Sequence, residues 1–249
     1  MGRRPSREKH KTRNDVFDAF TERNLFMLAS RGLFDEETLS PVMIGKEANI
    51  FRAKSEKGWV IIKIYRLETC DFNRMHEYLI VDPRYGSLTK NRRETIFAWC
   101  RREYANLLKA RTAGIAVPAV YANRANILVM ESIGGQRPAP QLKDVEVEDA
   151  QRMGDAIIAM LTRLWCDARL SHGDLSRFNI LVDRGEPVFI DFSQAVPLDA
   201  PNARELLERD AHNLSSDLAR FGYTMGADAI IEHVSQSFKS RERANHNRG

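Results

Sequence analysis

The chain has 249 residues, of which 43% are hydrophobic and 29% charged, a composition typical of a globular protein and not of a disordered one. It contains no run of about 18 apolar residues and no apolar stretch at its start, so we expect neither a transmembrane helix nor a secretory signal and predict a cytoplasmic protein. Its three cysteines lie far apart in the sequence, without the spacing of a zinc site or of a disulfide framework.

Positive charge is concentrated at the two ends of the chain. Residues 1–13 carry a net charge of +5 and residues 239–249 one of +3, so the remainder carries −4 although the whole chain has +4. Short basic segments beside a folded body suit salt-dependent contact with the phosphate backbone of a nucleic acid. The alternative is a solubilising role without any partner.

The first half of the chain predicts strands and helices around one irregular segment. Apolar spacing indicates a helix over 15–31, strands over 42–53 and 58–65, a polar loop over 70–93, a helix over 94–113 and a strand over 125–130. The loop has no sustained apolar periodicity and contains Pro83 and Gly86, so we expect it to be mobile and to order only near a ligand. Residues 134–140 then interrupt all periodicity and are the expected hinge between two lobes.

The second half is predicted to be mostly helical. Helices are expected over 147–169, 202–222 and 227–238, and two short apolar runs on either side of 183–187 predict a β-hairpin. We therefore divide the chain into a basic tail with an N-terminal helix (1–35), an N-lobe (36–133) that contains the mobile loop (70–93), a C-lobe (134–238) and a second basic tail (239–249).

Two charged residues fall where the pattern predicts burial. Lys63 interrupts the apolar run of the second strand, and Glu103 shares a helix stripe with Ile96, Cys100 and Leu107 at spacings of four, three and four. Lysine and glutamate are rarely buried without a partner, so either Lys63 extends to the surface or the two residues pair. We expect the pair, because each needs an opposite charge and a broken buried ion pair costs about 3–5 kcal/mol.

The chemistry-bearing residues follow one another in a recognisable order. They are Lys63, Glu103, His172-Gly-Asp174, Asn179 and Asp191-Phe192. The set resembles the strand Lys, helix Glu, His-x-Asp-x-x-x-x-Asn and Asp-Phe of protein kinases. The resemblance implies an α+β, bilobal, protein-kinase-like fold with a small β-rich N-lobe and a helical C-lobe.

Each residue of this set has a physical role in a kinase site. Lys63 is expected to hold the α- and β-phosphates of ATP, and Glu103 to fix its position. Asn179 and Asp191 are expected to coordinate Mg²⁺, or Mn²⁺ in its place, where it bridges the phosphates. Asp174 is expected to accept the proton of the acceptor hydroxyl or to orient it for in-line attack.

Several motifs of ordinary protein kinases are missing from the sequence. A Gly-x-Gly-x-x-Gly loop is absent, and only Gly45 stands in its place. Gly173 replaces a common arginine, Ser193 replaces the glycine of Asp-Phe-Gly, and the next helix is predicted about ten residues later. We therefore expect no ordinary peptide-docking platform. His172 is expected to hold the catalytic turn, and Asp183 to serve only as a hairpin-turn residue.

Four stretches, 45–49 (Gly-Lys-Glu-Ala-Asn), 62–65 (Ile-Lys-Ile-Tyr), 167–176 and 190–196 (Ile-Asp-Phe-Ser-Gln-Ala-Val), resemble the RIO atypical protein kinases over about residues 33 to 221. About forty residues precede Gly45, too few for the winged helix of the type 2 branch, so the type 1 branch fits better. The resemblance implies an ATP- and Mg²⁺-dependent serine/threonine kinase or ATPase. It also implies a cytoplasmic role on the pre-small-subunit ribosomal particle and its rRNA, not on DNA or a membrane, and it adds Lys46 to the nucleotide-binding residues.

Other functions remain open at this point. The kinase of the KEOPS tRNA-modification complex would carry Asp-Phe-Gly-Leu where residues 191–194 are Asp-Phe-Ser-Gln, and small-molecule phosphotransferases usually need a longer insert than residues 134–147 provide. A different class is a nucleotide-gated factor that docks on rRNA and releases on hydrolysis, with little transfer to protein. Phosphoserine on a partner, or free phosphate, would distinguish the two RIO-type functions.

Three further site predictions follow. The strand over 126–130 ends where a kinase would bind adenine, so Glu131 and Ile133 are expected to contact the base through their main chain, with Met130 behind the ring. The resemblance places autophosphorylation in the loop over 70–93, at Ser87 or, as the alternative, at Thr89. It also suggests the hypothesis that Asp191 carries the phosphoryl group transiently.

Overall fold

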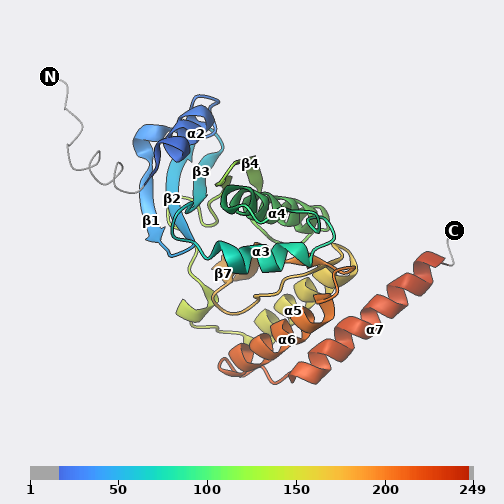
Figure 1. The fold of residues 1–249 in the computed structure, drawn as a ribbon. Helices are drawn as coiled ribbons and strands as arrows, with labels where there is room; N and C mark the ends of the chain where they lie inside the picture. Colours follow the sequence, from blue (N-terminus) through green and yellow to red (C-terminus); the bar gives the residue numbers. More distant parts are fainter. Residues whose placement is uncertain (1–16, 247–249) are drawn as a thin grey trace.

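A computed structural model describes residues 17–246, and within this range the strands of the first half form one five-stranded sheet (Figure 1). In chain order they are β1 (Ser40–Ile44), β2 (Ala48–Ser55), β3 (Gly58–Tyr65), β4 (Val120–Arg124) and β5 (Ile127–Glu131). The order across the sheet is β1-β2-β3-β5-β4, with antiparallel neighbours throughout. The central strand is therefore β3, which carries Lys63.

The prediction of one strand over 42–53 is wrong, because the chain turns back at residues 45–47 and makes two strands. The N–H of Gly45 donates to the carbonyl of Ala48 at 3.1 Å. A Cβ at position 45 would lie 2.6 Å from the same oxygen, so this close approach requires glycine. Strand β4 was not predicted, because the expected strand covered only residues 125–130.

Helices cover both faces of the sheet. Helix α2 (Ala19–Ala29), which begins at the Asp18 cap, packs on one face through Leu25 and Leu28. The long helix α4 (Arg92–Thr112) packs on the other face, and its start and end agree with the prediction within two residues. A short 3₁₀ helix (Glu36–Thr38) precedes β1.

The prediction of irregular structure over 70–93 is wrong for its first part, which forms helix α3 (Phe72–Ile80). Asp71 caps this helix by accepting the N–H of Arg74. Phe72, Met75 and Leu79 recur at helical spacing and face the core, a periodicity hidden by the polar residues between them. Residues 81–91 contain turns but neither helix nor strand.

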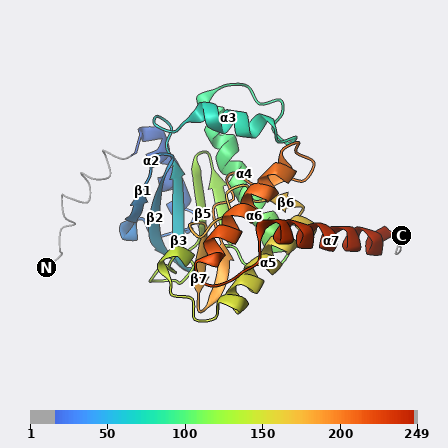
Figure 2. The ribbon, with the colours of Figure 1, turned by 90° about the horizontal axis from the view of Figure 1, so that it is seen from below.

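The second half is helical around a small hairpin, as predicted. A 3₁₀ helix (Leu142–Asp144) follows the linker, and the helices are α5 (Ala150–Cys166), α6 (Ala203–Ala219) and α7 (Ala227–His246). Strands β7 (Ile180–Asp183) and β8 (Glu186–Phe189) pair as the predicted hairpin, and β6 (Leu170–Ser171) pairs with β9 (Val196–Pro197). Figure 2 shows α5, α6 and α7 gathered on one side of the molecule and the sheet on the other.

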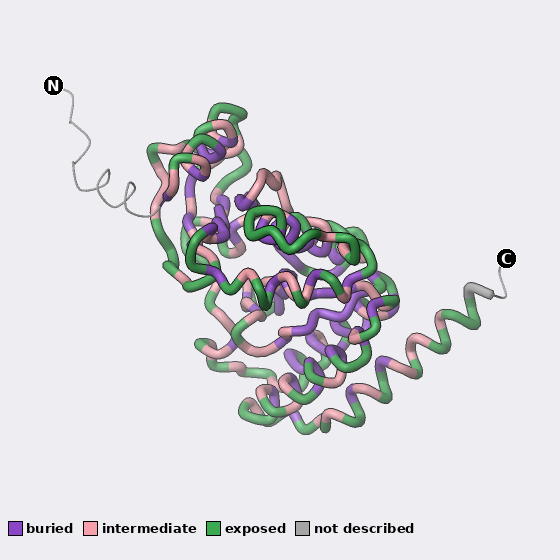
Figure 3. Tube along the Cα trace, in the orientation of Figure 1, coloured by how far each residue is buried: buried purple, intermediate pink, exposed green. Residues whose placement is uncertain are grey.

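The last helix extends beyond its predicted end. Residues 239–246, predicted as a basic tail, continue α7, because ion pairs of Arg241 with Asp167 and of Arg169 with Glu242 hold the helix against the body. Figure 3 shows few buried positions in its final turns. Residues 247–249 and the basic segment 1–13 lie outside the described residues.

One apolar core runs from the sheet face under α4 to α5, α6 and α7. A second, smaller core lies between the sheet and α2. The α+β division into a β-rich N-lobe and a helical C-lobe is thereby confirmed, and residues 132–141 connect the two without a regular strand or helix. In the part of the chain that the structure describes, no helix is both long enough and apolar enough to cross a membrane.

Candidate active site

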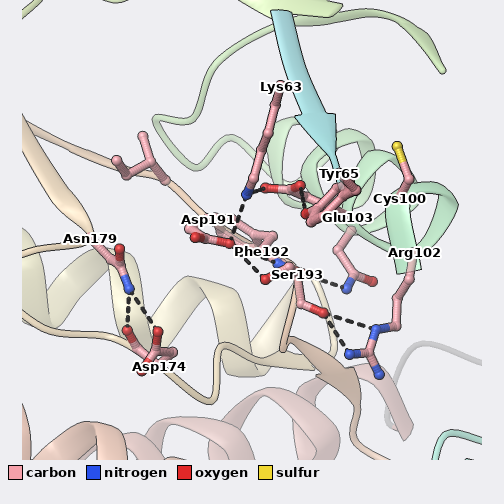
Figure 4. Close-up of polar contacts among 12 residues, drawn as sticks. Lys63, Tyr65, Cys100, Arg102, Glu103, Asp174, Asn179, Asp191, Phe192 and Ser193 are labelled. Carbon is pink, nitrogen blue, oxygen red and sulfur yellow. Dashed lines mark hydrogen bonds and ion pairs between the residues drawn. The ribbon is translucent and has the colours of Figure 1, made fainter. Parts of the chain in front are cut away.

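The predicted ion pair between the sheet and the long helix is present and has a third member. Nζ of Lys63 lies 2.8 Å from Oε1 of Glu103 and 3.1 Å from Oδ1 of Asp191. Lys63 is 7% exposed and Glu103 is fully buried. Figure 4 shows the ammonium group between the two carboxylates, which come from α4 and from the segment after β8. Strand β3, helix α4 and the Asp191 turn therefore meet at one lysine.

The charges of this cluster stabilise one another. Burial opposes the charged form of Lys63, but the carboxylates of Asp191 and Glu103 outweigh it and raise the pKa of Lys63 above its ordinary value. Desolvation opposes the charged form of Asp191 as well, yet Lys63 and the Ser193 hydroxyl lower the pKa of Asp191 to about 2. Both groups are therefore ionised at neutral pH.

Tyr65, two residues after Lys63, completes the environment of Glu103. Its hydroxyl donates to Oε2 of Glu103, while Oε1 accepts a hydrogen bond from Nζ of Lys63. Burial, followed by the charge of Glu103, raises the pKa of Tyr65 well above its ordinary value, so the hydroxyl keeps its proton and remains a donor. Both oxygens of the buried carboxylate are thus satisfied, as such a group requires.

The Asp191 turn is held by side chains of α4. Ser193 donates its hydroxyl to Oδ1 of Asp191 at 2.7 Å, and Asp191 itself has a φ of +60°, a conformation that costs a non-glycine residue about 1–2 kcal/mol. Arg102 donates to the carbonyl of Ser193 at 2.9 and 2.6 Å. Asn106 donates to the carbonyls of Phe192 and Ala195 at 3.1 and 2.7 Å. These bonds stabilise the strained turn.

Asp174 and Asn179 form the other half of the site. The Nδ2 group of Asn179 donates to the carbonyl of Asp174 at 2.7 Å and to its Oδ2 at 3.0 Å. Both residues are partly exposed. Burial and then the charge of Asp191 raise the pKa of Asp174, while Asn179 opposes the shift. A carboxylate with a raised pKa is a better proton acceptor.

The loop that carries Asp174 is anchored from α6. Asp210, fully buried, accepts the N–H of Gly173 and that of Leu175, each at 2.8 Å. Gly173 has a φ of +81°, and a Cβ there would meet Leu206 at 3.2 Å, so the arginine that is common in protein kinases does not fit this conformation. The two bonds fix the backbone N–H groups of the residues before and after Asp174.

His172 has the structural role that the sequence indicates. Its Nε2 donates to the carbonyl of Ile190 at 3.1 Å, which joins the Asp174 loop to the residue before Asp191. Burial lowers the pKa of His172 to about 4, so the ring is neutral at pH 7.

The donor set of Asp191 and Asn179 fits a magnesium ion that also binds phosphate. Because both bonds of the Asn179 amide nitrogen go to Asp174, its oxygen is turned away from Asp174 (Figure 4). Oδ1 of Asp191 accepts hydrogen bonds from Lys63 and Ser193, and among the described residues Oδ2 accepts none. Among residues 17–246 no group of three or more His, Cys, Asp or Glu could hold a metal by itself. Two oxygen ligands supplemented by substrate phosphates are what Mg²⁺ uses in such sites.

The remaining predicted site residues lie at the edges of this arrangement. Lys46 is exposed in the turn between β1 and β2, and Met130 and Glu131 end β5 with partial exposure. Ile133 follows in the linker and is also partly exposed. Ser87 is exposed in the turn region after α3, whereas the hydroxyl of Thr89 donates to Glu94 at the start of α4.

The sequence patterns did not indicate the residues that support the site. They are Tyr65, Arg102, Asn106, Ser193 and Asp210. Asp210 could have been found by the argument used for Glu103, because it shares the buried stripe of Leu206, Leu207 and Leu214 on α6. Arg102 and Asn106 lie four apart on the inward side of α4, but only the structure shows that both donate to backbone carbonyls.

The RIO domain family model matches residues 49–230 of the chain. The RIO-type serine/threonine-protein kinase Rio1 of Methanocaldococcus jannaschii is 41% identical over 214 residues, which cover 86% of this chain and 73% of that protein. Rio1 of Haloferax volcanii is 37% identical over 229 residues, with 91% and 78% covered. The Rio2 kinase–ADP/Mg²⁺–phosphoaspartate complex from Chaetomium thermophilum aligns with a TM-score of 0.61 at 22% identity, over 90% of this chain and 75% of that one.

The family match covers the Lys63, Asp174, Asn179 and Asp191 positions, and two archaeal Rio1 relatives align over most of the chain. The structural likeness to Rio2 agrees with the kinase-like fold. The predicted resemblance is confirmed, and RIO membership is favoured over the KEOPS and small-molecule alternatives. The chain belongs to the RIO family and is a serine/threonine protein kinase of the Rio1 type, similar to those of archaea.

Proposed function

We propose that the cluster around Lys63 and Asp191 binds ATP with Mg²⁺ and transfers the γ-phosphoryl group to a serine or threonine during maturation of the small ribosomal subunit in the cytoplasm. The observation that supports this function best is Lys63 paired with both Glu103 and Asp191, opposite the Asp174–Asn179 pair. The ribosomal part rests on family membership.

Each residue has a distinct task in the transfer. Lys63 binds the α- and β-phosphates, and Glu103 holds it in position. When bound through Asn179 and Asp191, Mg²⁺ neutralises phosphate charge. Asp174 takes the proton of the acceptor hydroxyl as that oxygen bonds to the γ-phosphorus, and the bond to the β–γ bridging oxygen breaks to release ADP.

The end of β5 has the backbone groups that adenine recognition needs. The N–H of Glu131 donates to Ala119, and the carbonyl of Ile133 accepts from Ala139. The N–H of Ile133 has no hydrogen-bond partner across residues 17–246, and the carbonyl of Glu131 lies at the end of β5 two residues before it. These two groups bind the adenine edge, with Met130 packing behind the ring and Lys46 near the phosphates. A nucleotide complex with adenine elsewhere would contradict this placement.

A second function, nucleotide-gated docking on rRNA with little protein phosphorylation, is favoured by the short segment after the site. Residues 192–202 alone separate Asp191 from α6, which leaves no room for an ordinary peptide-docking platform. Among the described residues Oδ2 of Asp191 accepts no hydrogen bond, so this oxygen can bond to the γ-phosphorus while the bond to the β–γ bridging oxygen breaks and ADP leaves. Water then hydrolyses the aspartyl phosphate, which releases phosphate and restores the carboxylate. The phosphoaspartate in the Rio2 complex is a property of that protein and motivates the hypothesis.

One experiment separates the two functions. ATP turnover is measured with purified pre-small-subunit particles present and absent, with free phosphate and phosphoprotein followed together. Phosphoserine or phosphothreonine on a particle protein supports the kinase, and phosphate release stimulated by the particle supports the docking factor. A hydroxylamine-sensitive label on the chain, absent from Asp191→Asn, identifies the aspartyl phosphate. No turnover in either case contradicts both.

Ser87 is the proposed autophosphorylation site. Its side chain is exposed, whereas Thr89 is engaged with Glu94 at 2.5 Å. After incubation with ATP and Mg²⁺, mass spectrometry should find phosphate at Ser87, and Ser87→Ala should remove most of the label. Label confined to residues 1–16, or unchanged when Ser87→Ala and Thr89→Ala are combined, would contradict the assignment.

A further inference from the structure

Two exposed arginines from different lobes meet at one tyrosine beside the Asp174 loop. Arg74 lies on α3 and Arg209 on α6, and both are exposed. The guanidinium carbon of Arg74 is 5.8 Å from the ring centroid of Tyr78, and Arg209 donates to Oε1 of Gln194 at 3.4 Å. Hydrogen bonding from Arg209, and to a smaller extent from Arg74, lowers the pKa of Tyr78. The contacts therefore place Arg74 over the Tyr78 ring and Arg209 against Gln194, and the direction of the Tyr78 pKa shift agrees with both guanidinium groups acting on its hydroxyl.

The pair lies next to the residue expected to act on the acceptor. Arg209 directly precedes Asp210, whose carboxylate holds the N–H groups on both sides of Asp174. The position of a Cβ on Gly173 is 3.3 Å from the carbonyl of Gln194, so the Gln194 contact of Arg209 lies beside the same loop. The positive charges of Arg209 and Arg74 both oppose the rise in the pKa of Asp174, which burial and Asp191 cause.

The charge of these arginines is not neutralised locally. Arg84, Arg177 and Arg204 form ion pairs with carboxylates at 2.6, 3.4 and 2.8 Å. By contrast, within the described range neither Arg74 nor Arg209 has a carboxylate oxygen within 4 Å. Glu47 and Asp71 act on Arg74 only from farther away. Two positive charges near each other repel, and an anion placed between them would remove that cost.

The arrangement is also held in place before any ligand binds. The carbonyl of Tyr78 accepts from Nη1 of Arg102 at 2.8 Å, and the same buried arginine binds the carbonyl of Ser193. Tyr78 further packs edge-to-face on Trp99, with ring centroids 6.2 Å apart. Helix α3 is therefore fixed relative to the Asp191 turn and to Gln194, so the two arginines are preorganised.

We propose that Arg74 and Arg209 form an anion subsite that binds a carboxylate or phosphomonoester side chain of the protein substrate, close to the serine or threonine that receives phosphate. Guanidinium groups suit either anion, because they donate parallel hydrogen bonds to two oxygens. The subsite rests on the proposed protein-kinase function of Asp174. It gives the enzyme a preference for acidic or previously phosphorylated segments, although no extended peptide platform is present.

The test uses synthetic serine peptides that differ only beside the acceptor, with neutral, glutamate, phosphoserine or lysine neighbours. Transfer is measured for the wild-type chain, Arg74→Ala, Arg209→Ala and the double variant, with Arg204→Ala as the matched control on α6. For wild type we expect kcat/KM about 10- to 100-fold higher for the anionic peptides than for the neutral one, by analogy with hydrogen bonds to charged groups. The double variant should lose this preference through KM, with the neutral peptide and the KM for ATP unchanged.

A binding measurement keeps the proposal testable if transfer to peptides is slow. Fluorescence anisotropy with ADP and Mg²⁺ present should show the phosphoserine and glutamate peptides bound about tenfold more tightly than the neutral one, and only the double variant should lose the difference. A preference that survives in the double variant overturns the proposal. An equal loss of ATP affinity in the double variant also overturns it, because the arginines would then bind the nucleotide. Single-stranded RNA serves as a further probe, and a double variant that loses affinity only for this RNA overturns the proposal as well. Wild-type enzyme that turns over no ATP at all would instead contradict the proposed function.

Discussion

The two halves of the active site are built in opposite ways. The Lys63–Glu103 half is buried, and its charges neutralise one another at 2.8 Å. The Asp174–Asn179 half is partly exposed and is held through the backbone, by Asp210 on α6 and by the Asn179 amide. Asp191 lies between them, with a side chain 38% exposed.

The difference follows from what each half must bind. A lysine that meets triphosphate has to be charged and correctly placed before the nucleotide arrives, and a buried carboxylate partner achieves this at the cost of desolvation. An acid that meets a protein hydroxyl must stay accessible, so it cannot be fixed by burial. Removing a residue from the first half should therefore damage folding and nucleotide binding together, whereas removing Asp174 from the second half should affect transfer alone.

The largest effect is expected for Asp174→Ala. Loss of a proton acceptor lowers transfer by about 10²–10⁴-fold, but the affinity for ATP with Mg²⁺ should hardly change, because Asp174 acts on the acceptor. Lys63→Ala, Asn179→Ala and Asp191→Ala should each weaken nucleotide binding instead. Transfer rates and nucleotide titrations check this, with Asp183→Ala in the neighbouring hairpin turn as the control. An equal loss of nucleotide affinity in Asp174→Ala would remove the distinction between the two halves.

Glu103→Ala should be the most destabilising change in the site. It leaves Lys63 buried with Asp191 as its remaining carboxylate and Tyr65 without its acceptor, so the free energy of unfolding should fall by about 3–5 kcal/mol. Asn179→Ala removes two hydrogen bonds from a partly exposed group and should cost about 1–3 kcal/mol. Urea denaturation of both variants provides the comparison. Equal losses of unfolding free energy in the two variants would mean that burial does not make the Lys63–Glu103 half more important for stability than the Asp174–Asn179 half.

The sequence predicted the ion pair of the buried half better than the residues that hold the Asp191 turn in place. Lys63 and Glu103 stood out because charged residues interrupted apolar patterns, and this conflict can be seen without a structure. Arg102 and Asn106 were missed because their partners are the carbonyls of residues 192–195, which no side-chain pattern records. Helix α3 was missed because its narrow apolar stripe is carried by only a few residues among polar ones.

The arginine side chains without an ion-pair partner beside the site were its least predictable feature. Within residues 17–246 neither Arg74 nor Arg209 has a carboxylate partner, and this depends on how α3 and α6 are placed in the fold, which is a tertiary property. The end of α7 was misassigned because its basic composition resembles a tail, although Arg241 and Glu242 have ion-pair partners on the body. Local composition cannot show that such partners exist.

Two buried groups behind the exposed half should give opposite pH dependences of stability. The pKa of His172 falls from 6.5 to about 4, so the contribution of His172 to the free energy of unfolding is present above pH 6.5 and is lost as the pH falls through 4. Burial raises the pKa of Asp210 from 3.8 to about 7, so its contribution is present below pH 3.8 and is lost as the pH rises through 7. Each shift corresponds to roughly 3–4 kcal/mol.

Between pH 4 and 6.5 the two effects partly cancel in the wild-type chain, and single variants should separate them. As the pH falls from 7 to 4, the free energy of unfolding of His172→Gln should rise relative to wild type, and that of Asp210→Asn should fall, each by roughly 3 kcal/mol. Urea denaturation at several pH values measures both slopes. If the free energies of unfolding of wild type, His172→Gln and Asp210→Asn changed in parallel with pH, neither His172 nor Asp210 would have the shifted pKa that its burial predicts.

The smallest effect is expected where the two halves meet, at Ser193. Ser193→Ala removes the hydroxyl that donates to Asp191 at 2.7 Å. Hydrogen bonds to charged groups contribute about 1.5–3 kcal/mol, and partial exposure of this carboxylate favours the lower end.

Ser171 is the matched control, because its buried hydroxyl has no partner among the described residues, so Ser171→Ala should be nearly neutral. The free energy of unfolding and the affinity for ATP with Mg²⁺ should both fall in Ser193→Ala, because Asp191 belongs to the ion cluster and to the proposed metal site. A loss of stability without a loss of nucleotide affinity would assign Asp191 to the buried half alone.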